Sequence, residues 1–431
     1  MRCASLTSFQ AVPLERAPAR RNVMTLSAAV GGLALLVSTQ GPSGEVLDLP
    51  SAVKTALQHN PEVAQARAAR DAERAGAAGA RAWPEPSLSY QAWQQPLATP
   101  FDPTATNMHM LGIRQTLPFP GQLGRAGRAA EAGAAARGAD FLAARLRLEA
   151  QVAHALNGYW LIQHELEAHA RHLELGQQTV AAVRARYVSG QARQADLLRA
   201  ETELHRQHAS IAGLRENLRG TMALLNALLG RPPDSALPAA SEPEAELPSG
   251  ALERPEVAAA RLRTVEAQES AALADKARRL PEVMVGFDYM LMPGMPDAYS
   301  VMLQVPMPWL SGRRTADAER ARRQVEELHF AKASAENAAR YEVAEAQAGV
   351  AAARAQLVVT EEKLVPGAER ALEATRASYV AGQADLLALL DAESALLDAR
   401  LSQVRQRAAQ GDAIADLRRA LGLSLISEKQ P

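Results

Sequence analysis

The stretch RYVSGQARQADLLRAETEL (residues 186–204) recurs 192 residues later as SYVAGQADLLALLDAESAL (residues 378–396). Ten of the nineteen positions are identical. The period is too long for a solenoid repeat, so it indicates a duplicated half of the chain. Each copy holds a glycine after Tyr-Val-x, and a helix C-terminus commonly needs a residue with positive φ. The stretch therefore predicts the tip of a helical hairpin, present twice.

Two further landmarks recur in the same order. Pro61-Glu62-Val63 returns as Pro255-Glu256-Val257, and Leu117-Pro118-Phe119-Pro120 returns as Val305-Pro306-Met307-Pro308. These recurrences predict two copies of one unit and a linker rich in Pro, Glu and Ser between them. The expected bounds are 45–236 for the first repeat, 237–250 for the linker, 250–424 for the second repeat and 425–431 for a C-terminal tail.

The first 40 residues have the pattern of an export signal. Arg16, Arg20 and Arg21 precede an apolar run at 24–37, which is short for a membrane-spanning helix of about 20 residues. We therefore expect a signal peptide at 1–40. The only cysteine, Cys3, lies inside it, which argues against a cysteine nucleophile or a cysteine-based metal site in the exported protein. The net charge of −1 gives no electrostatic case for nucleic acid as a partner.

Long helices are predicted where proline is missing. No proline occurs from 121 to 231 or from 309 to 365, and alanine is frequent in both runs. Such runs favour helices, so we expect helical hairpins at 122–229 and 313–421. The first long arm, 122–186, would reach about 100 Å at about 1.5 Å per residue. Pro366-Gly367 predicts a kink in the corresponding arm of the second repeat.

Four segments change from a helical period to a period of two, which is typical of strands. We expect strands at about 86–95, 107–117, 282–292 and 298–308. Strands of about ten residues have the length of a tilted membrane-spanning β-strand. Trp83, Trp93, Phe119 and Trp309 lie near their ends, as in the aromatic girdles of membrane barrels. Soluble hairpins with ordinary aromatic packing are the alternative.

Four strands cannot close a membrane barrel, because known barrels begin at about eight. Unpaired strand edges cannot face lipid, since each unsatisfied backbone group there costs several kcal/mol. If these strands enter a membrane, other copies of the chain must therefore complete the barrel. Three copies supply twelve strands, and we expect a homotrimer.

These features in this order resemble the TolC-like outer-membrane efflux channel family. The residues that carry the resemblance are Asn60-Pro61, the corner Leu117-Pro118-Phe119-Pro120-Gly121 and the two Tyr-x-x-Gly tips. The resemblance covers essentially all of the chain after the signal. It implies a mainly α fold with a pair of membrane β-hairpins, a trimeric 12-stranded β-barrel and a 12-helix periplasmic α-barrel. The implied location is the outer membrane of a Gram-negative envelope, with the helices spanning the periplasm.

The resemblance also implies a function and partners. We expect the outer-membrane channel of a tripartite efflux system, with a periplasmic adaptor (membrane fusion) protein, an inner-membrane pump of the RND type and outer-membrane lipid as partners. The alternatives are the conduit of a type I protein secretion system and a periplasmic coiled-coil adaptor or structural protein. No enzyme activity and no cofactor are expected, since His154, His164, His169 and His172 are scattered along one helix without the converging ligands that zinc needs.

Site residues follow from the resemblance, position by position. Tyr379 matches a tyrosine that latches the periplasmic gate, and Asp391 matches one acidic residue of the tunnel mouth. Ala388 stands where a second acidic residue often lies, while Tyr187 and Asp196 are the equivalents in the first repeat. The residues expected to contact the adaptor are those of the two tips: Tyr187, Gly190, Gln191, Tyr379, Gly382 and Gln383.

Methionines gather in and beside the predicted strands, where eight of the eleven are found. If the apolar strand faces point to lipid, most of these thioethers face the lumen or the loop. Thioethers are soft ligands that suit Cu(I) or Ag(I), and similar methionine-rich loops occur in the heavy-metal branch of the family. The sequence thus favours heavy-metal cations of the copper or silver type over drugs, with transient contacts at Met290, Met292, Met295 and Met302. Methionine as an adaptable apolar filler is the alternative.

Overall fold

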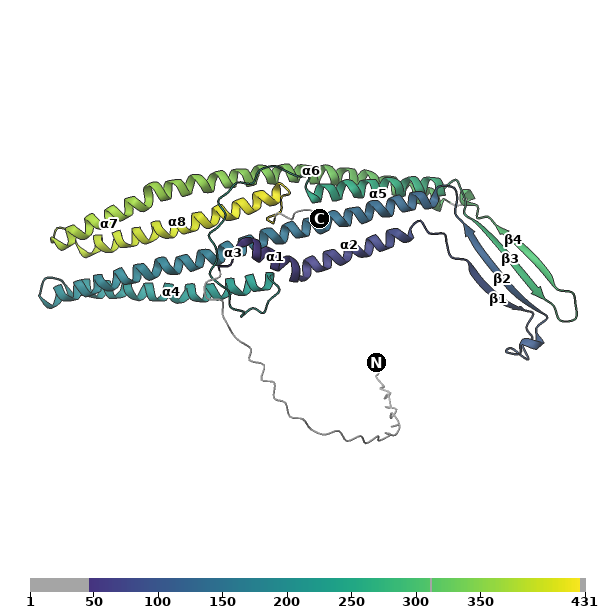
Figure 1. The fold of residues 1–431 in the computed structure, drawn as a ribbon, viewed down its shortest axis with the longest axis horizontal. Helices are drawn as coiled ribbons and strands as arrows, with labels where there is room; N and C mark the ends of the chain where they lie inside the picture. Colours follow the sequence, from purple (N-terminus) through teal and green to yellow (C-terminus); the bar gives the residue numbers. More distant parts are fainter. Residues whose placement is uncertain (1–45, 311, 427–431) are drawn as a thin grey trace, which may run out of the picture. The chain divides into compact units, whose positions relative to one another are not determined.

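The computed structural model describes residues 46–310 and 312–426. The chain divides into two units, residues 1–43 and 44–431, and the first unit, with the expected signal peptide and Cys3, lies outside the described residues. The second unit is mainly helical, with one small antiparallel sheet (Figure 1).

Two short helices precede the first strand, and one residue separates them. α1 (Leu49–His59) ends and α2 (Pro61–Gly79) begins at Asn60. The Asn60 backbone nitrogen donates to Ala56 O at 2.8 Å, and its side chain accepts from the Glu62 nitrogen at 2.9 Å. Because a proline at the first helical position needs no hydrogen-bond partner, Asn60-Pro61 ends one helix and starts the next.

The first long hairpin consists of α3 (Gln122–Val188) and α4 (Gln194–Leu228), as expected for 122–229. The 67 residues of α3 span about 100 Å at about 1.5 Å per residue. At the far end the chain reverses at Gly190, whose φ is +77°. α3 also packs against α1, α2, α5 (Pro255–Ala277) and α8 (Leu386–Ala420). This helix is therefore the central element of the unit.

The second long arm contains an irregularity close to the expected kink. It runs as α6 (Arg313–Val359), the π-helical segment η3 (Thr360–Leu364) and α7 (Val365–Val380). Val365 donates to Thr360 O, a bond one residue wider than that of an α-helix. Pro366 has no N–H and its ring crowds the preceding turn, so the helix changes its hydrogen bonding immediately before the proline. The chain then reverses at Gly382, with φ +73°, into α8.

Apolar side chains fill the contacts between helices. One cluster joins α1 and α2 to the middle of α3 and the end of α4, with Val53, Val63, Val152 and Leu225 among its buried members. A second cluster lies near the tips and includes Val183 of α3, Leu372 of α7 and Leu389 of α8. The two hairpins therefore pack against each other at their tips.

All four predicted strands are present, in one antiparallel sheet of order β1-β2-β3-β4. β1 (Ser87–Trp93) and β4 (Ala298–Gln304) have seven residues, β2 (Met108–Leu117) has ten and β3 (Val283–Leu291) has nine. The expectation of about ten residues was wrong for the outer strands. β1 ends at Trp93, and the next residue, Gln94, has φ +57°. Pro306 has no N–H for a ladder, and Pro308–Leu310 forms the 3₁₀ helix η2.

One face of this sheet is apolar and open. Its exposed members come from all four strands and lie in register: Leu88, Tyr90, Leu111, Ile113, Phe287, Tyr289, Tyr299, Val301 and Leu303. The predicted alternation is therefore confirmed. Trp83, Trp93 and Trp309 are also exposed. Phe119, which was expected beside them, is 5% exposed, because it lies in the corner between β2 and α3 and lines a cavity with residues of α5 and α6.

The segment between the repeats is tied to the helices although it has little regular structure. Leu47 donates to Ala239 O at 2.8 Å, and Ser241 donates to Leu47 O at 3.0 Å. Glu242 and Glu244 form ion pairs with Arg407 and Arg418 of α8. Among the described residues, no helix combines the length and the apolar character that crossing a bilayer requires.

Candidate functional site

The face of the sheet opposite the apolar one is polar. A row of residues in register crosses it, with Ser89, Gly112, Asp288 and Ser300 on successive strands. Arg114 donates to Ser89 Oγ at 2.8 Å and to Asp288 Oδ1 at 3.3 Å. A Cβ on Gly112 would collide with the Asp288 carboxylate, so glycine leaves the space in which the buried Asp288 lies. A sheet with one apolar face and one face that carries an ion pair and serines among methionines and glycines suits a wall between lipid and water.

The candidate methionines lie on or near this polar face. Met290 pairs with Met110 across β3 and β2, and Met302 pairs with Gly286. Met290 and Met302 are two rows apart, about 13 Å at about 3.3 Å per residue, so they do not share one ligand set. Met292 and Met295 lie in the turn between β3 and β4, and Met295 is exposed. The structure therefore places thioethers at several levels along the sheet, with Met110 and Met290 side by side at one of them.

The two hairpin tips have the same backbone bonds. Gln191 donates to Arg186 O at 2.7 Å and Gln383 to Ser378 O at 2.8 Å, while each tip glycine donates to the tyrosine three residues before it. This is the arrangement in which a left-handed residue closes a helix end. With no side chain at Gly190 or Gly382, the backbone of both tips is accessible to a partner.

The tyrosines of the tips differ in their surroundings. Tyr379 is 8% exposed; the Arg186 guanidinium lies 4.9 Å from its ring centroid and donates to its backbone oxygen at 3.0 Å. Tyr187 is exposed. Arg186 was missed by the sequence reasoning. The signal for it was a difference between the repeats, because Ser378 stands at the equivalent position.

The acidic candidates also differ. Asp196 accepts from the Arg193 backbone nitrogen at 3.2 Å and so caps α4. Asp391 is exposed on α8 and has no ion pair within the described part of the chain. A carboxyl group not predicted from the sequence lies nearby: Glu393 is buried and accepts from Thr179 Oγ1 at 2.7 Å. Burial raises the pKa of Glu393, and this hydrogen bond opposes that effect.

The histidines of α3 make separate local contacts. The ring nitrogens of His154 lie 3.1 Å from Asp412 and 3.1 Å from Asp416 of α8. Hydrogen bonds to these two carboxylates raise the pKa of His154 to about 10. His164 stacks on Trp160, and His169 bonds to Gln207. Burial lowers the pKa of His172. Within residues 46–310 and 312–426, no group of three or more His, Cys, Asp or Glu is placed to hold a metal ion.

The sheet with two unlike faces and the long paired helices belong to a chain whose sequence matches a known family. The profile of the outer membrane efflux protein family matches residues 52–231 and 247–423, which is most of the chain. The chain belongs to the outer membrane efflux protein family. Proteins of this family are channels, so the chain is a protein of the outer membrane and not an enzyme. The match also decides against the periplasmic adaptor and scaffold alternatives.

Solved structures share this fold. The chain is similar to the outer membrane protein VceC from Vibrio cholerae, with 24% identity, a TM-score of 0.74 and coverage of 88% of this chain and 97% of VceC. It is similar to CusC, which forms a transmembrane channel, with 21% identity, a TM-score of 0.77 and coverage of 87% and 92%. It is also similar to the MtrE outer membrane channel of Neisseria gonorrhoeae in its open state, with 22% identity, a TM-score of 0.73 and coverage of 89% and 91%. No curated protein matches the chain.

Proposed function

We propose that three copies of this chain form a trimer in which their sheets close a 12-stranded barrel in the outer membrane. The observation that carries this proposal is the four-stranded sheet itself. Within the described part of the chain, β1 and β4 each pair on one side only, while the apolar face is exposed. Unpaired strand edges and an exposed apolar face are both unfavourable in a single chain. Neighbouring copies that pair edge to edge complete the backbone hydrogen bonds, and the apolar face then lies toward lipid.

The long helices continue the barrel as a periplasmic tunnel of twelve helices in this proposal. The channel serves as the exit duct of a tripartite efflux system, and its tips contact a periplasmic adaptor that connects it to an inner-membrane pump of the RND type. The shared conformation of the two tips supports this role, because it gives six equivalent turns per trimer. The contact residues are Tyr187, Gly190, Gln191, Tyr379, Gly382 and Gln383.

Gating is assigned to the same end of the tunnel. Tyr379 and Asp391 of the second hairpin act at the tunnel mouth, together with Tyr187 and Asp196 of the first. Arg186, which holds the Tyr379 backbone, belongs to this set because it connects the two hairpins. Asp391, whose carboxylate has no ion pair among the described residues, supplies the negative charge of the mouth.

For the cargo we propose soft heavy-metal cations of the copper or silver type. The support is the placement of Met290 and Met302 on the polar face of the sheet and of Met292 and Met295 in the adjoining turn. Thioethers bind such ions and not hard cations. Thioethers at several levels along the sheet permit the transient contacts that a conduit requires.

Assembly and conduction test the proposal together. The full chain, extracted from membranes in detergent, should have the mass of three protomers by light scattering and should form conducting pores in a planar lipid bilayer. A folded monomer that needs no detergent would overturn the barrel, and a trimer without conductance would overturn the channel function.

A further inference from the structure

Arginine doublets stand on both sides of the second pair of strands. Arg278-Arg279 lies just before β3, and Arg313-Arg314 begins α6 directly after β4 and η2. Residues 275–282 and 312–326 hold eight basic and five acidic side chains, whereas the whole chain has a net charge of −1. The junction between this strand pair and its helices is therefore locally positive.

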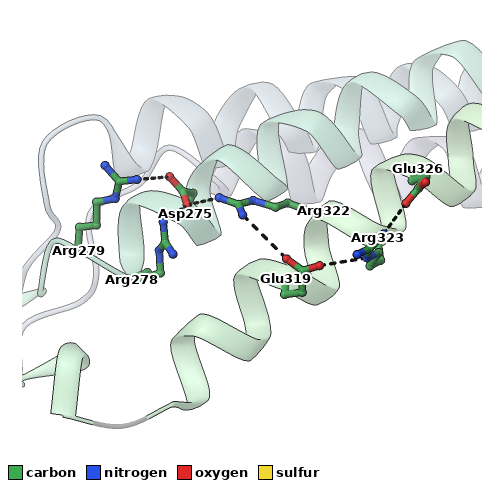
Figure 2. Close-up of polar contacts among 7 residues, drawn as sticks. All are labelled: Asp275, Arg278, Arg279, Glu319, Arg322, Arg323 and Glu326. Atoms are coloured by element: carbon green, nitrogen blue, oxygen red, sulfur yellow. Dashed lines mark hydrogen bonds and ion pairs between the residues drawn. The ribbon is translucent and has the colours of Figure 1, made fainter.

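The carboxylates at this junction are shared among several arginines. Figure 2 shows Asp275 of α5 with Arg278, Arg279 and Arg322 around it, and the nearest N–O distances are 2.8, 3.4 and 2.8 Å. Farther along α6, Arg323 lies between Glu319 at 3.0 Å and Glu326 at 3.1 Å. Arg322 also lies 3.9 Å from Glu319, so three carboxylates (Asp275, Glu319 and Glu326) face four guanidinium groups and this Asp275 cluster keeps one positive charge.

Two of the arginines remain open to an external anion. The side chain of Arg279 is 68% exposed. Arg313 is exposed and has no ion pair within the described part of the chain. Arg314 differs, because it donates to Ala277 O at 2.6 Å and so ties the start of α6 to the end of α5. The positions of Arg279 and Arg313 on either side of the strand pair are thereby fixed by the fold.

Apolar side chains adjoin these charges. Trp309 and Leu310 of η2 are 62% and 71% exposed, and they lead from the apolar face of the sheet to Arg313. Tryptophan prefers the level of the lipid headgroups, and the planar fork of arginine matches the oxygens of a phosphate. The combination fits a bilayer surface, with apolar groups toward the acyl chains and guanidinium groups toward the headgroups.

The corresponding junction of the first repeat has a smaller excess of positive charge. Arg81 pairs with Glu131 at 2.8 Å, and Arg125 and Arg128 both bind Glu269 at 3.0 and 3.1 Å. Two carboxylates there face three guanidinium groups, and every one of these arginines has an ion pair. The larger excess, and an arginine without an ion pair among the described residues (Arg313), thus distinguish the second repeat.

We propose that Arg279 and Arg313, supported by the Asp275 cluster and Trp309, bind the phosphate headgroup of an anionic phospholipid in the leaflet that adjoins the helices. The inference rests on the proposed insertion of the sheet into the outer membrane, and it adds a lipid-recognition site that channel function alone does not require. A trimer would carry three such sites, one beside each second strand pair.

The test uses the full chain in a neutral detergent, with phosphatidylglycerol or phosphatidylcholine added in steps. Bound lipids are counted by native mass spectrometry, and the midpoint of thermal unfolding is followed in parallel. Wild type should bind phosphatidylglycerol in preference to phosphatidylcholine. The Arg279→Gln/Arg313→Gln variant should lose about fivefold in affinity per removed charge. The control variant Arg215→Gln/Arg219→Gln, which removes two exposed arginines from α4, should bind like wild type.

Three results would overturn the inference: an unchanged preference in the double variant, an equal loss in the control, or the same stabilisation by inorganic phosphate at equal concentration. Conductance in a neutral bilayer separates this inference from the proposed function. If the wild-type trimer conducts but shows no headgroup preference, only the lipid site is refuted. If the wild-type trimer does not conduct, the proposed channel function is refuted.

Discussion

At the tips, Arg186 holds Tyr379 by its backbone oxygen and its ring face, and within the described residues the phenol hydroxyl has no hydrogen bond. The contacts of the Tyr379 ring and backbone can therefore be tested separately from its hydroxyl group. Tyr379→Phe keeps both contacts and should leave single-channel conductance in a planar bilayer unchanged. Arg186→Ala removes both and should raise the conductance or the open probability if the pair helps to close the mouth. A large effect of Tyr379→Phe together with a silent Arg186→Ala would contradict this assignment.

His154 gives a prediction for pH. Its pKa is raised from 6.5 to about 10 by two aspartates of α8, so the folded protein binds this proton more tightly than the unfolded chain. The resulting stabilisation is complete below pH 6.5 and is lost as the pH rises to about 10. His154→Gln should therefore lower the thermal unfolding midpoint at pH 6 and change it little at pH 10. An equal decrease at both pH values would show that the charge is not the cause.

Replacement of the candidate methionines tests whether their sulfur atoms serve the proposed metal cargo. Exchange of Met290, Met292, Met295 and Met302 for leucine keeps volume and apolarity, and such exchanges usually cost less than about 1.5 kcal/mol each. Cells with this variant should become more sensitive to copper or silver, while their resistance to an organic drug stays the same. Unchanged metal resistance at a normal protein level would make these methionines packing residues and remove the argument for metal over drug.

At the scale of elements, the sequence predicted the long helices, the tips and the four strands because each has a strong local cause. Missing prolines, a recurring glycine and a period of two act within a few residues. The strand ends were less accurate, since Gln94 gives no sign of its left-handed backbone. The buried Glu393–Thr179 bond depends on which faces of α3 and α8 meet, which short-range patterns do not encode.

The two tip turns give a prediction for the hairpins. Gly190 and Gly382 have φ values of +77° and +73°, where a side-chain-bearing residue costs about 1–2 kcal/mol. Replacement of both by valine should distort both tips and abolish efflux, while membrane insertion and trimer formation remain normal. Alanine at Gly213, a helical glycine of α4 with open space around it, is the control. Efflux that survives the double change would exclude the tips as the adaptor-contacting surface.

The proposed trimer predicts a particular cross-link between neighbouring copies of the whole chain. In a closed ring, β4 of one copy lies beside β1 of the next, so cysteines on these strands can meet only between copies. Two double variants in a Cys3→Ser background test this: Ser300→Cys/Ser87→Cys and Ser300→Cys/Gln91→Cys. On oxidation, the variant whose two cysteines lie opposite each other between copies should give covalent dimers and trimers. Cysteines at Met110 and Met290, which pair within one chain, should give monomers only. Dimers as the final product would exclude a ring of three.

The match between the arms depends on the π-helical segment. The run from Arg313 to Val380 is one residue longer than α3. In an uninterrupted α-helix, one additional residue turns everything beyond it by about 100° and advances it by about 1.5 Å. A single π-helical turn takes up one residue locally, and η3 lies between the strand junction and the tip. The segment thus takes up the one-residue difference between the arms, and Tyr379 stays turned toward Arg186.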